Sequence, residues 1–475
     1  MRAGMKRPFL LLLALVSGWL LPACGARSSL TEPGGSDACG FWNVYDGAVG
    51  TLHHASLDFA VLDDGSVVVP MEESIVGADS DAFPTVTRQW VRKLHPDGAI
   101  AWEVEGEPEK LGFSAAARDG AGGIYVAGAV GPGAPSVLGA AVPCAGEGTC
   151  AFVAKLTPMG EPTWVKVFPS NDVRAAVNHL AVMDDGRITL EGAFDGTLDL
   201  GCGPVSGTAD GLWANLFVAR LSPSGECLWS RALVSPQLFS GFTDMAVGDA
   251  GDVALVLHLT AEGPPGSSID FGGGPVPSSS SVDYGHPLAV AKYAPDGAFV
   301  FAKVATSGFC QSVPKVAVTG AGEVLLSAAY TGPIDLGGGP RGSADDTRQF
   351  VTKLGATGEE LWTRDIASGK YGGGEVFAIA IEPGDGFFLA GQGRVGMSIL
   401  GEPVPEETLF AAAFDAGGQP IDVQTFPFSG QGLDLGLSAS APSSLVLVGQ
   451  FDRVHDFDDG PWWGPEKALV ARICP

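Results

Sequence analysis

Cysteine is the residue type in this chain whose number and spacing most directly predict chemistry. Cys24 lies in an N-terminal leader, and seven further cysteines follow it, at 39, 144, 150, 202, 227, 310 and 474. Outside the cytoplasm such thiols persist as disulfides. We predict that Cys144 pairs with Cys150 across the loop CAGEGTC and that Cys202 pairs with Cys227. Seven is odd, so one thiol, which we take to be Cys310, remains. The cysteines lack paired C-x-x-C spacing, which argues against structural zinc.

Other reactive residue types give weaker signals. No H-E-x-x-H, G-x-S-x-G or G-x-x-x-x-G-K motif surrounds the seven histidines, at 53, 54, 95, 179, 258, 286 and 455. The sequence Asp456-Phe-Asp458-Asp459-Gly460 is a weak calcium candidate, because a hard cation needs several oxygens from one loop. Asp-Gly is also a common turn, and a solvated turn is the alternative. We therefore expect no catalytic residue and no cofactor, with calcium as the one exception to test.

The N-terminus has the composition of an export signal. Arg2, Lys6 and Arg7 precede an apolar run from Phe9 to Leu21, and Leu-Pro-Ala-Cys24 follows. This run of about 13 residues is short of the roughly 20 that a transmembrane helix needs. Leu-Pro-Ala-Cys24 resembles the lipobox of bacterial lipoproteins. The resemblance implies a signal peptide at 1–23, a lipidated Cys24, a flexible tether over 24–40 and a cell-envelope location. Gly25 in place of Asp favours the outer membrane.

Charge and composition limit the partners and the fold class. Removal of residues 1–23 takes away three positive charges, so the formal net charge goes from -27 to -30. Nucleic acid is excluded as an expected partner, because phosphate contacts need clustered Lys and Arg. The 69 glycines and 34 prolines indicate many short strands joined by turns.

An internal repeat fills the mature chain. Segments such as Phe152-Val-Ala-Lys-Leu-Thr-Pro-Met-Gly160 recur with their Lys/Arg position at 93, 155, 220, 292, 353, 413 (an alanine) and 472. The successive spacings are 62, 65, 72, 61, 60 and 59 residues. A Trp strand follows each Pro-x-Gly turn, at Trp102, Trp164, Trp229 and Trp362 in the clearest copies. An Ala-Val strand, a Gly turn and an apolar strand complete the unit.

Four strands at a constant period predict a propeller blade. We expect an all-β fold, a seven-bladed β-propeller of four-stranded blades over residues 41–475. Its repeats run approximately 41–98, 99–160, 161–225, 226–297, 298–358, 359–418 and 419–475. A closed ring leaves no sheet face uncovered and brings the two ends of the array together. Cys39 and Cys474 lie at those ends, so we predict a third disulfide between them.

Two known repeat types are similar to these units. Ala116 to Gly128 (AARDGAGGIYVAG) and Phe350 to Trp362 resemble bacterial β-propeller repeats of the SBBP type. Thr357-Gly-Glu-Glu-Leu-Trp362 resembles, more distantly, the tryptophan-docking repeat of quinoprotein dehydrogenases and of an outer-membrane assembly lipoprotein. Both resemblances imply a propeller.

Three functions fit this sequence. The first is an envelope-anchored lipoprotein acting as a non-catalytic binding or scaffolding propeller, with a protein or glycan ligand held by its variable loops. The second is a propeller hydrolase or lyase with a site at the mouth of the central channel. No polar residue type recurs at the inner strand position, which favours the first, whereas three or more charged side chains converging there would favour the second. The third is an outer-membrane assembly factor.

Overall fold

A computed structural model describes residues 40–473 of the 475-residue chain, apart from intervening gaps. The gaps are 44–50, 56–57, 76–84, 107–109, 135, 143, 145–147, 170–173, 208–214, 235–239, 260–267, 278–286, 306–308, 311–312, 343–346, 370–374, 383, 394–397, 400–401, 404–407, 428–434, 442–443 and 452–466. All regular elements in the described ranges are β-strands. No helix among these residues is long and apolar enough to cross a membrane.

The first half of the chain forms four antiparallel sheets. Sheet 1 contains β2 (Thr51–Ala55), β3 (Ala60–Val61), β4 (Val67–Ile75), β5 (Thr85–Leu94) and β6 (Ile100–Gly106). Sheet 2 contains β7 (Leu111–Arg118), β8 (Ile124–Val130), β11 (Cys150–Leu156) and β12 (Pro162–Val167). Sheet 3 contains β13 (Ala175–Val182), β14 (Ile188–Phe194), β17 (Asn215–Leu221) and β18 (Cys227–Val234). Sheet 4 contains β19 (Ser240–Val247), β20 (Val253–Leu259), β23 (Leu288–Tyr293) and β24 (Phe299–Ala305).

The second half forms three more sheets of the same kind. Sheet 5 contains β25 (Phe309–Cys310), β26 (Lys315–Val318), β27 (Val324–Thr331), β28 (Thr347–Leu354) and β29 (Glu360–Gly369). Sheet 6 contains β30 (Glu375–Ile381), β31 (Phe387–Gly393), β34 (Thr408–Phe414) and β35 (Pro420–Pro427). Sheet 7 contains β36 (Leu435–Ala441), β37 (Ser444–Phe451), β38 (Lys467–Ile473) and, from the other end of the chain, β1 (Gly40–Asn43).

Short two-stranded hairpins project from four of these sheets, between the second and third long strands. They are β9 (Ser136–Val137) with β10 (Ala140–Ala141), β15 (Thr197–Asp199) with β16 (Pro204–Ser206), β21 (Ser268–Asp270) with β22 (Pro275–Pro277), and β32 (Ser398–Ile399) with β33 (Glu402–Pro403).

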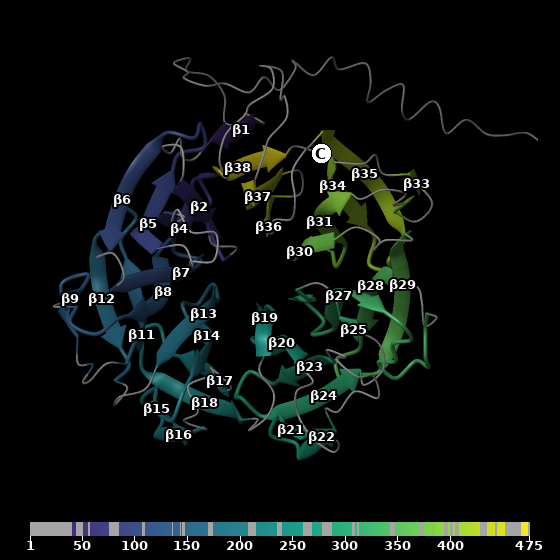
Figure 1. Ribbon diagram of the computed structural model, residues 1–475, viewed down its shortest axis with the longest axis horizontal. Coiled ribbons are helices and arrows are strands. Elements are labelled where there is room, and N and C mark those ends of the chain that lie inside the picture. Colours follow the sequence, from purple (N-terminus) through teal and green to yellow (C-terminus); the bar gives the residue numbers. More distant parts are fainter. Residues whose placement is uncertain are drawn as a thin grey trace, which may run out of the picture.

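The sheets stand around a common centre, which is the arrangement of a β-propeller (Figure 1). Strands β7, β13, β19, β30 and β36 lie nearest the centre, and β6, β12, β18, β24, β29 and β35 lie at the rim. Sheets 1 and 5 have five strands because β2 and β3 both pair with β4, and β25 and β26 both pair with β27. The inner strand is thus divided in two in these sheets.

The core lies between neighbouring sheets. Every residue of β14 and of β20 is buried, because both faces of these strands are covered. One apolar cluster joins sheets 2 and 3 and includes Tyr125, Phe168, Leu190 and Phe217. Apolar clusters of the same kind join each adjacent pair of sheets from 1 to 6, as the repeat predicts.

The two recurring motifs of the sequence meet in this architecture. Lys155 of β11 lies directly opposite Trp164 of β12. The same register joins Lys93 with Trp102, Arg220 with Trp229, and Lys353 with Trp362. The Trp side chain then packs on the Pro-x-Gly turn of the next sheet: Trp102 Nε1 donates to the carbonyl of Pro158 at 2.9 Å. These Trp residues therefore join adjacent sheets.

The sheets are offset by one strand from the sequence repeats. Sheet 2 takes β7, β8 and β11 from the repeat at 99–160 and takes β12 from the next one. In sheet 7 the outer position beside β38 is taken by a strand from the other end of the described chain. β1 pairs there, with Gly40 opposite Arg472 and Asn43 opposite Leu469. The N-terminal strand of the described chain thus completes the C-terminal sheet.

Candidate functional site

Ionisable side chains share one position on the inner strands. Seven residues before the glycine of the Ala-Val turn stand Asp58, Ala115, His179, Asp244, Lys315 and Ile379, in sheets 1 to 6. Asp58 lies between β2 and β3, where it forms an isolated bridge with Ala115. In β7 and β13 a register shift immediately precedes this position, and in β19 the shift lies between Ser240 and Phe242. Such bulges re-aim side chains. With Glu191 and Thr243, the four ionisable members of this set form the central cluster on the inner side of the ring.

His179 connects several sheets. Its Nδ1 lies 2.9 Å from Asp58 Oδ2, and its Nε2 lies 3.0 Å from the carbonyl oxygen of Thr243. Both partners are acceptors, so both ring nitrogens carry protons and the imidazole is a cation. Burial lowers the pKa of His179, but the charge of Asp58 and its hydrogen bond outweigh this and raise the pKa to about 10.

Asp58 is held by backbone groups as well. The amide of Leu180 donates to its Oδ2 at 3.2 Å, and the amide of Ala116 donates to its carbonyl at 2.8 Å. One carboxylate of sheet 1 is thereby fixed against sheets 2 and 3. Its position does not depend on His179 alone.

Glu191 lies behind this ion pair. It stands opposite His179 in the β13–β14 register and is fully buried. Thr243 Oγ1 donates to its Oε2 at 3.3 Å, whereas its Oε1 has no hydrogen-bond partner among the described residues. Burial raises the pKa of Glu191 to about 7, against the opposing effects of the His179 charge and the Thr243 hydroxyl. This carboxyl group can therefore both donate and accept a proton near neutral pH.

Asp244 and Lys315 extend the cluster to sheets 4 and 5. The amide of Val316 donates to Asp244 Oδ2 at 2.8 Å. Burial raises the pKa of Asp244, and the charges of Lys315 and His179 oppose that rise. The cluster can thus transfer protons and stabilise charge. In the described part of the chain no group of three His, Cys, Asp or Glu side chains is arranged to hold a metal ion.

The sequence does contain a signal for this cluster, but the signal is a recurring charge and not a recurring residue type. Alignment on the turn glycine places Asp58, His179, Asp244 and Lys315 in one column, next to Ala115. Their types differ, so a search for one recurring polar type does not find them. Charge recurs at this position, and identity does not. Glu191 is recognised only from its place opposite His179 on β14.

The residues predicted from the sequence lie elsewhere. Cys144 and Cys150 form a disulfide, and so do Cys202 and Cys227. Cys310 lies on β25. Cys24, Cys39, Cys474, Asp456, Asp458 and Asp459 lie outside the described residues.

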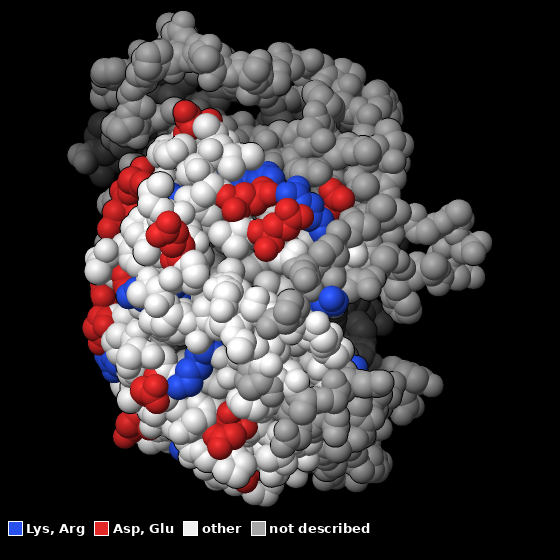
Figure 2. Space-filling view, turned by 90° about the vertical axis from the view of Figure 1, so that its left-hand side faces the viewer, with Lys and Arg blue, Asp and Glu red and all other residues white. Residues whose placement is uncertain are grey.

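Surface charge is mostly acidic on the face that Figure 2 shows. Red carboxylate groups are spread over the described surface, with fewer blue basic groups among them. Several cations of the described chain are paired with carboxylates: Arg88 contacts Glu105 at 2.7 Å, and Lys166 contacts Glu226 at 3.1 Å. The described residues on this face form no extended basic patch for a phosphate backbone.

Comparisons with known proteins give structural likeness only. No protein family and no curated protein matches the sequence. The polysaccharide lyase Uly1 is 10% identical, with 96% of this chain and 95% of that chain covered and a TM-score of 0.45. A PL25 ulvan lyase is 8% identical, with 89% and 95% covered and a TM-score of 0.45. The α-L-arabinofuranosidase Arb93A from Fusarium graminearum is 10% identical, with 89% and 97% covered and a TM-score of 0.37. Likeness at this level does not establish a shared activity.

Proposed function

We propose that this protein is a seven-bladed β-propeller enzyme of the hydrolase or lyase class, with its proton-transfer groups on the central side of the ring. The observation that carries the proposal is the convergence of Asp58, His179, Asp244 and Lys315 at one inner-strand position, beside Glu191. The same position is apolar in sheets 2 and 6, at Ala115 and Ile379, so packing does not require a charge there. Several ionisable groups with shifted pKa values in one place are typical of an active site.

Each member of the cluster has a distinct role in this proposal. Glu191 exchanges the proton, since its pKa of about 7 suits both directions of transfer. It is fully buried, so the half-buried Thr243 hydroxyl, which donates to it at 3.3 Å, relays the proton to the substrate side. The cations of His179 and Lys315 stabilise negative charge that develops on the substrate. Asp58 positions His179 and keeps it protonated.

Purified mature chain assayed against neutral and uronic-acid polysaccharides tests this proposal. Hydrolysis releases reducing ends, and lyase action also creates an absorbing unsaturated product. We expect Glu191→Gln to reduce kcat about 100-fold or more, because the amide cannot exchange the proton. Glu161→Gln, on an exposed hairpin turn, is the matched control and keeps full activity. Equal activity of wild type and Glu191→Gln would refute the assignment of Glu191.

A non-catalytic binding or scaffolding propeller is the second candidate, and it includes an outer-membrane assembly factor. The observation that favours it is that both ring nitrogens of His179 are already engaged within the protein. The cluster then serves to join sheets. Lack of any bond cleavage by the wild type, with His179→Gln lowering stability, supports this candidate.

We also propose that lipid on Cys24 anchors the protein to the envelope, and that a Cys39–Cys474 disulfide reinforces the closure that β1 makes with β38. Peptide mass mapping of membrane-extracted protein, with and without reduction, tests both. An acylated N-terminal peptide and a crosslinked Cys39–Cys474 pair are expected. Cys24→Ser should release the protein from the membrane fraction, and its retention there would contradict the anchor.

A further inference from the structure

A cavity of about 730 Å³ lies at the rim of the ring, between sheets 2 and 3. One wall is the end of β12 with the residues after it, including Lys166, Val167 and Phe168. The other is the β15–β16 hairpin, including Thr197, Asp199 and Leu200. We propose that this cavity is a binding site for one or two units of a neutral carbohydrate. It is separate from the central cluster and does not depend on its function.

A comparison with the corresponding grooves between sheets 3 and 4 and between sheets 4 and 5 explains why this cavity is open. Lys166, Arg231 and Lys303 each stand two residues after the aromatic residue of an outer strand. Lys303 Nζ fills its groove by donating to the carbonyl of Leu336 at 2.7 Å. Arg231 occupies the groove between sheets 3 and 4: a Cβ on Gly272 would lie 2.9 Å from its guanidinium, and its Nε donates to the carbonyl of Gly297 at 2.5 Å. The corresponding cation between sheets 2 and 3 is Lys166, and it forms an ion pair with Glu226 instead.

Lys166, which lines the cavity, pairs with Glu226 Oε1 at 3.1 Å. The side chain of Lys166 is 31% exposed and that of Glu226 is 74% exposed. An exposed pair of this kind contributes little stability, so exchanging it for a ligand contact is inexpensive. Lys166 therefore supplies a hydrogen-bond donor to the cavity. Lys303 does not, because it is already bound to the carbonyl of Leu336.

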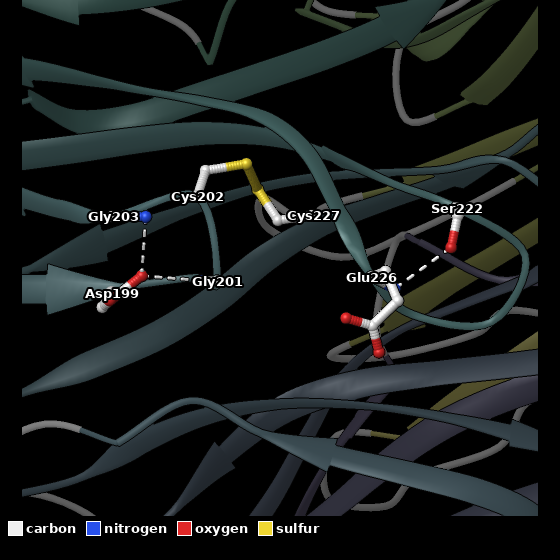
Figure 3. Close-up of a disulfide and its surroundings, with 7 residues drawn as sticks. All are labelled: Asp199, Gly201, Cys202, Gly203, Ser222, Glu226 and Cys227. Carbon is white, nitrogen blue, oxygen red and sulfur yellow. Dashed lines mark hydrogen bonds between the residues drawn. A yellow bond between two sulfur atoms is a disulfide. The ribbon is translucent and has the colours of Figure 1, made fainter.

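The hairpin wall is held rigidly. Asp199 Oδ1 accepts hydrogen bonds from the amides of Gly201 at 2.7 Å and Gly203 at 3.1 Å. The Cys202–Cys227 disulfide joins the same turn to the start of β18, and Glu226 stands one residue before that cysteine (Figure 3). A wall fixed in advance lowers the ordering cost of binding.

The lining suits a polyhydroxyl compound. Val167, Pro169 and Pro204 present apolar surface. Lys166 donates hydrogen bonds, and the hydroxyl of Thr197 both donates and accepts. Glu226 balances the charge of Lys166, and Asp199 in the lining already accepts two amide hydrogen bonds, so neither an anion nor a cation is strongly favoured. Sugar rings combine apolar C–H faces with donor and acceptor hydroxyls. The volume falls in the range of roughly 300–1,000 Å³ that is usual for small-molecule sites.

The test is binding of neutral trisaccharides of glucose, mannose, galactose and xylose to the mature chain, screened by saturation-transfer NMR and quantified by calorimetry. At least one should bind. Lys166→Ala should weaken that binding at least fivefold, and Thr197→Trp, which places an indole in the cavity from its exposed edge, should abolish it. Lys303→Ala, the matched control from the filled groove, should change it less than twofold.

Binding by none of the trisaccharides overturns the proposal, and so does binding that neither Lys166→Ala nor Thr197→Trp weakens. The central cluster is tested separately, by bond cleavage in the polysaccharide assay. Glu161→Gln, on an exposed turn outside the cavity lining, should leave trisaccharide affinity unchanged. Loss of binding at the rim and loss of cleavage at the centre are therefore different results.

Discussion

Replacing His179 with glutamine tests the electrostatic structure of the central cluster. The pKa of His179 is raised from 6.5 to about 10. Each unit corresponds to about 1.4 kcal/mol, so protonation contributes on the order of 5 kcal/mol to the folded state. Because the folded pKa is the higher one, this contribution is fully present below pH 6.5 and is lost as the pH rises through about 10.

Urea unfolding of wild type and His179→Gln, from about pH 6 to about pH 10, measures the effect. Other groups titrate in this range, so the informative quantity is the difference in unfolding free energy between the two proteins. We expect that difference to be largest at the acidic end and to shrink steadily toward the alkaline end. His95→Gln, on an exposed hairpin turn, controls for the loss of a histidine.

A second variant tests the same ion pair if His179→Gln folds poorly. Asp58→Asn removes the carboxylate that accepts from His179 Nδ1 at 2.9 Å but keeps an oxygen acceptor of the same shape. The pKa of His179 should fall, so the loss of stability should move to lower pH. A difference between wild type and His179→Gln that stays constant from pH 6.5 to about 10 would refute the reasoning.

Two further substitutions test the contact between sheets 3 and 4 at Gly297 and the disulfide within sheet 3. Gly297 has a φ of +81°, and a Cβ there would lie 2.6 Å from the Trp229 ring, so Gly297→Ala should destabilise the protein by roughly 2–4 kcal/mol in a melting experiment. Gly274, with a φ of +102° and open space around it, is the control and should lose only about 1 kcal/mol; equal losses would contradict the Trp contact. Replacing Cys202 and Cys227 together by serine should cost about 3 kcal/mol, since the pair closes a loop of 25 residues. Unchanged denaturant midpoints would show that the hairpin is held without the disulfide.

The repeat made the architecture predictable. The Lys/Arg and Trp positions recur at steady spacing because each Trp must reach the turn of the next sheet, as Trp102 reaches Pro158. Such nearest-neighbour contacts are written locally into every repeat. The pairings of Cys144 with Cys150 and of Cys202 with Cys227 follow from short separations within one or two adjacent repeats.

The offset between repeats and sheets was not predictable in the same way. The sequence places each Trp strand at the beginning of a repeat, but a hairpin joins it to the preceding Lys/Arg strand, as β12 follows β11. The repeat period alone does not indicate which of the four strands in a repeat is the first strand of a sheet. The pairing of β1 with β38 removes that ambiguity.

The sequence by itself determined that the chain is a series of similar four-stranded units, because strand patterning, turn glycines and inter-sheet contacts are short-range properties. The tertiary structure decided which charges meet. Asp58 and His179 are 121 residues apart, and only closure of the sheets around one centre places their atoms 2.9 Å from each other. The same closure buries Glu191 beside them and shifts its pKa toward neutrality, since burial depends on every neighbouring sheet at once.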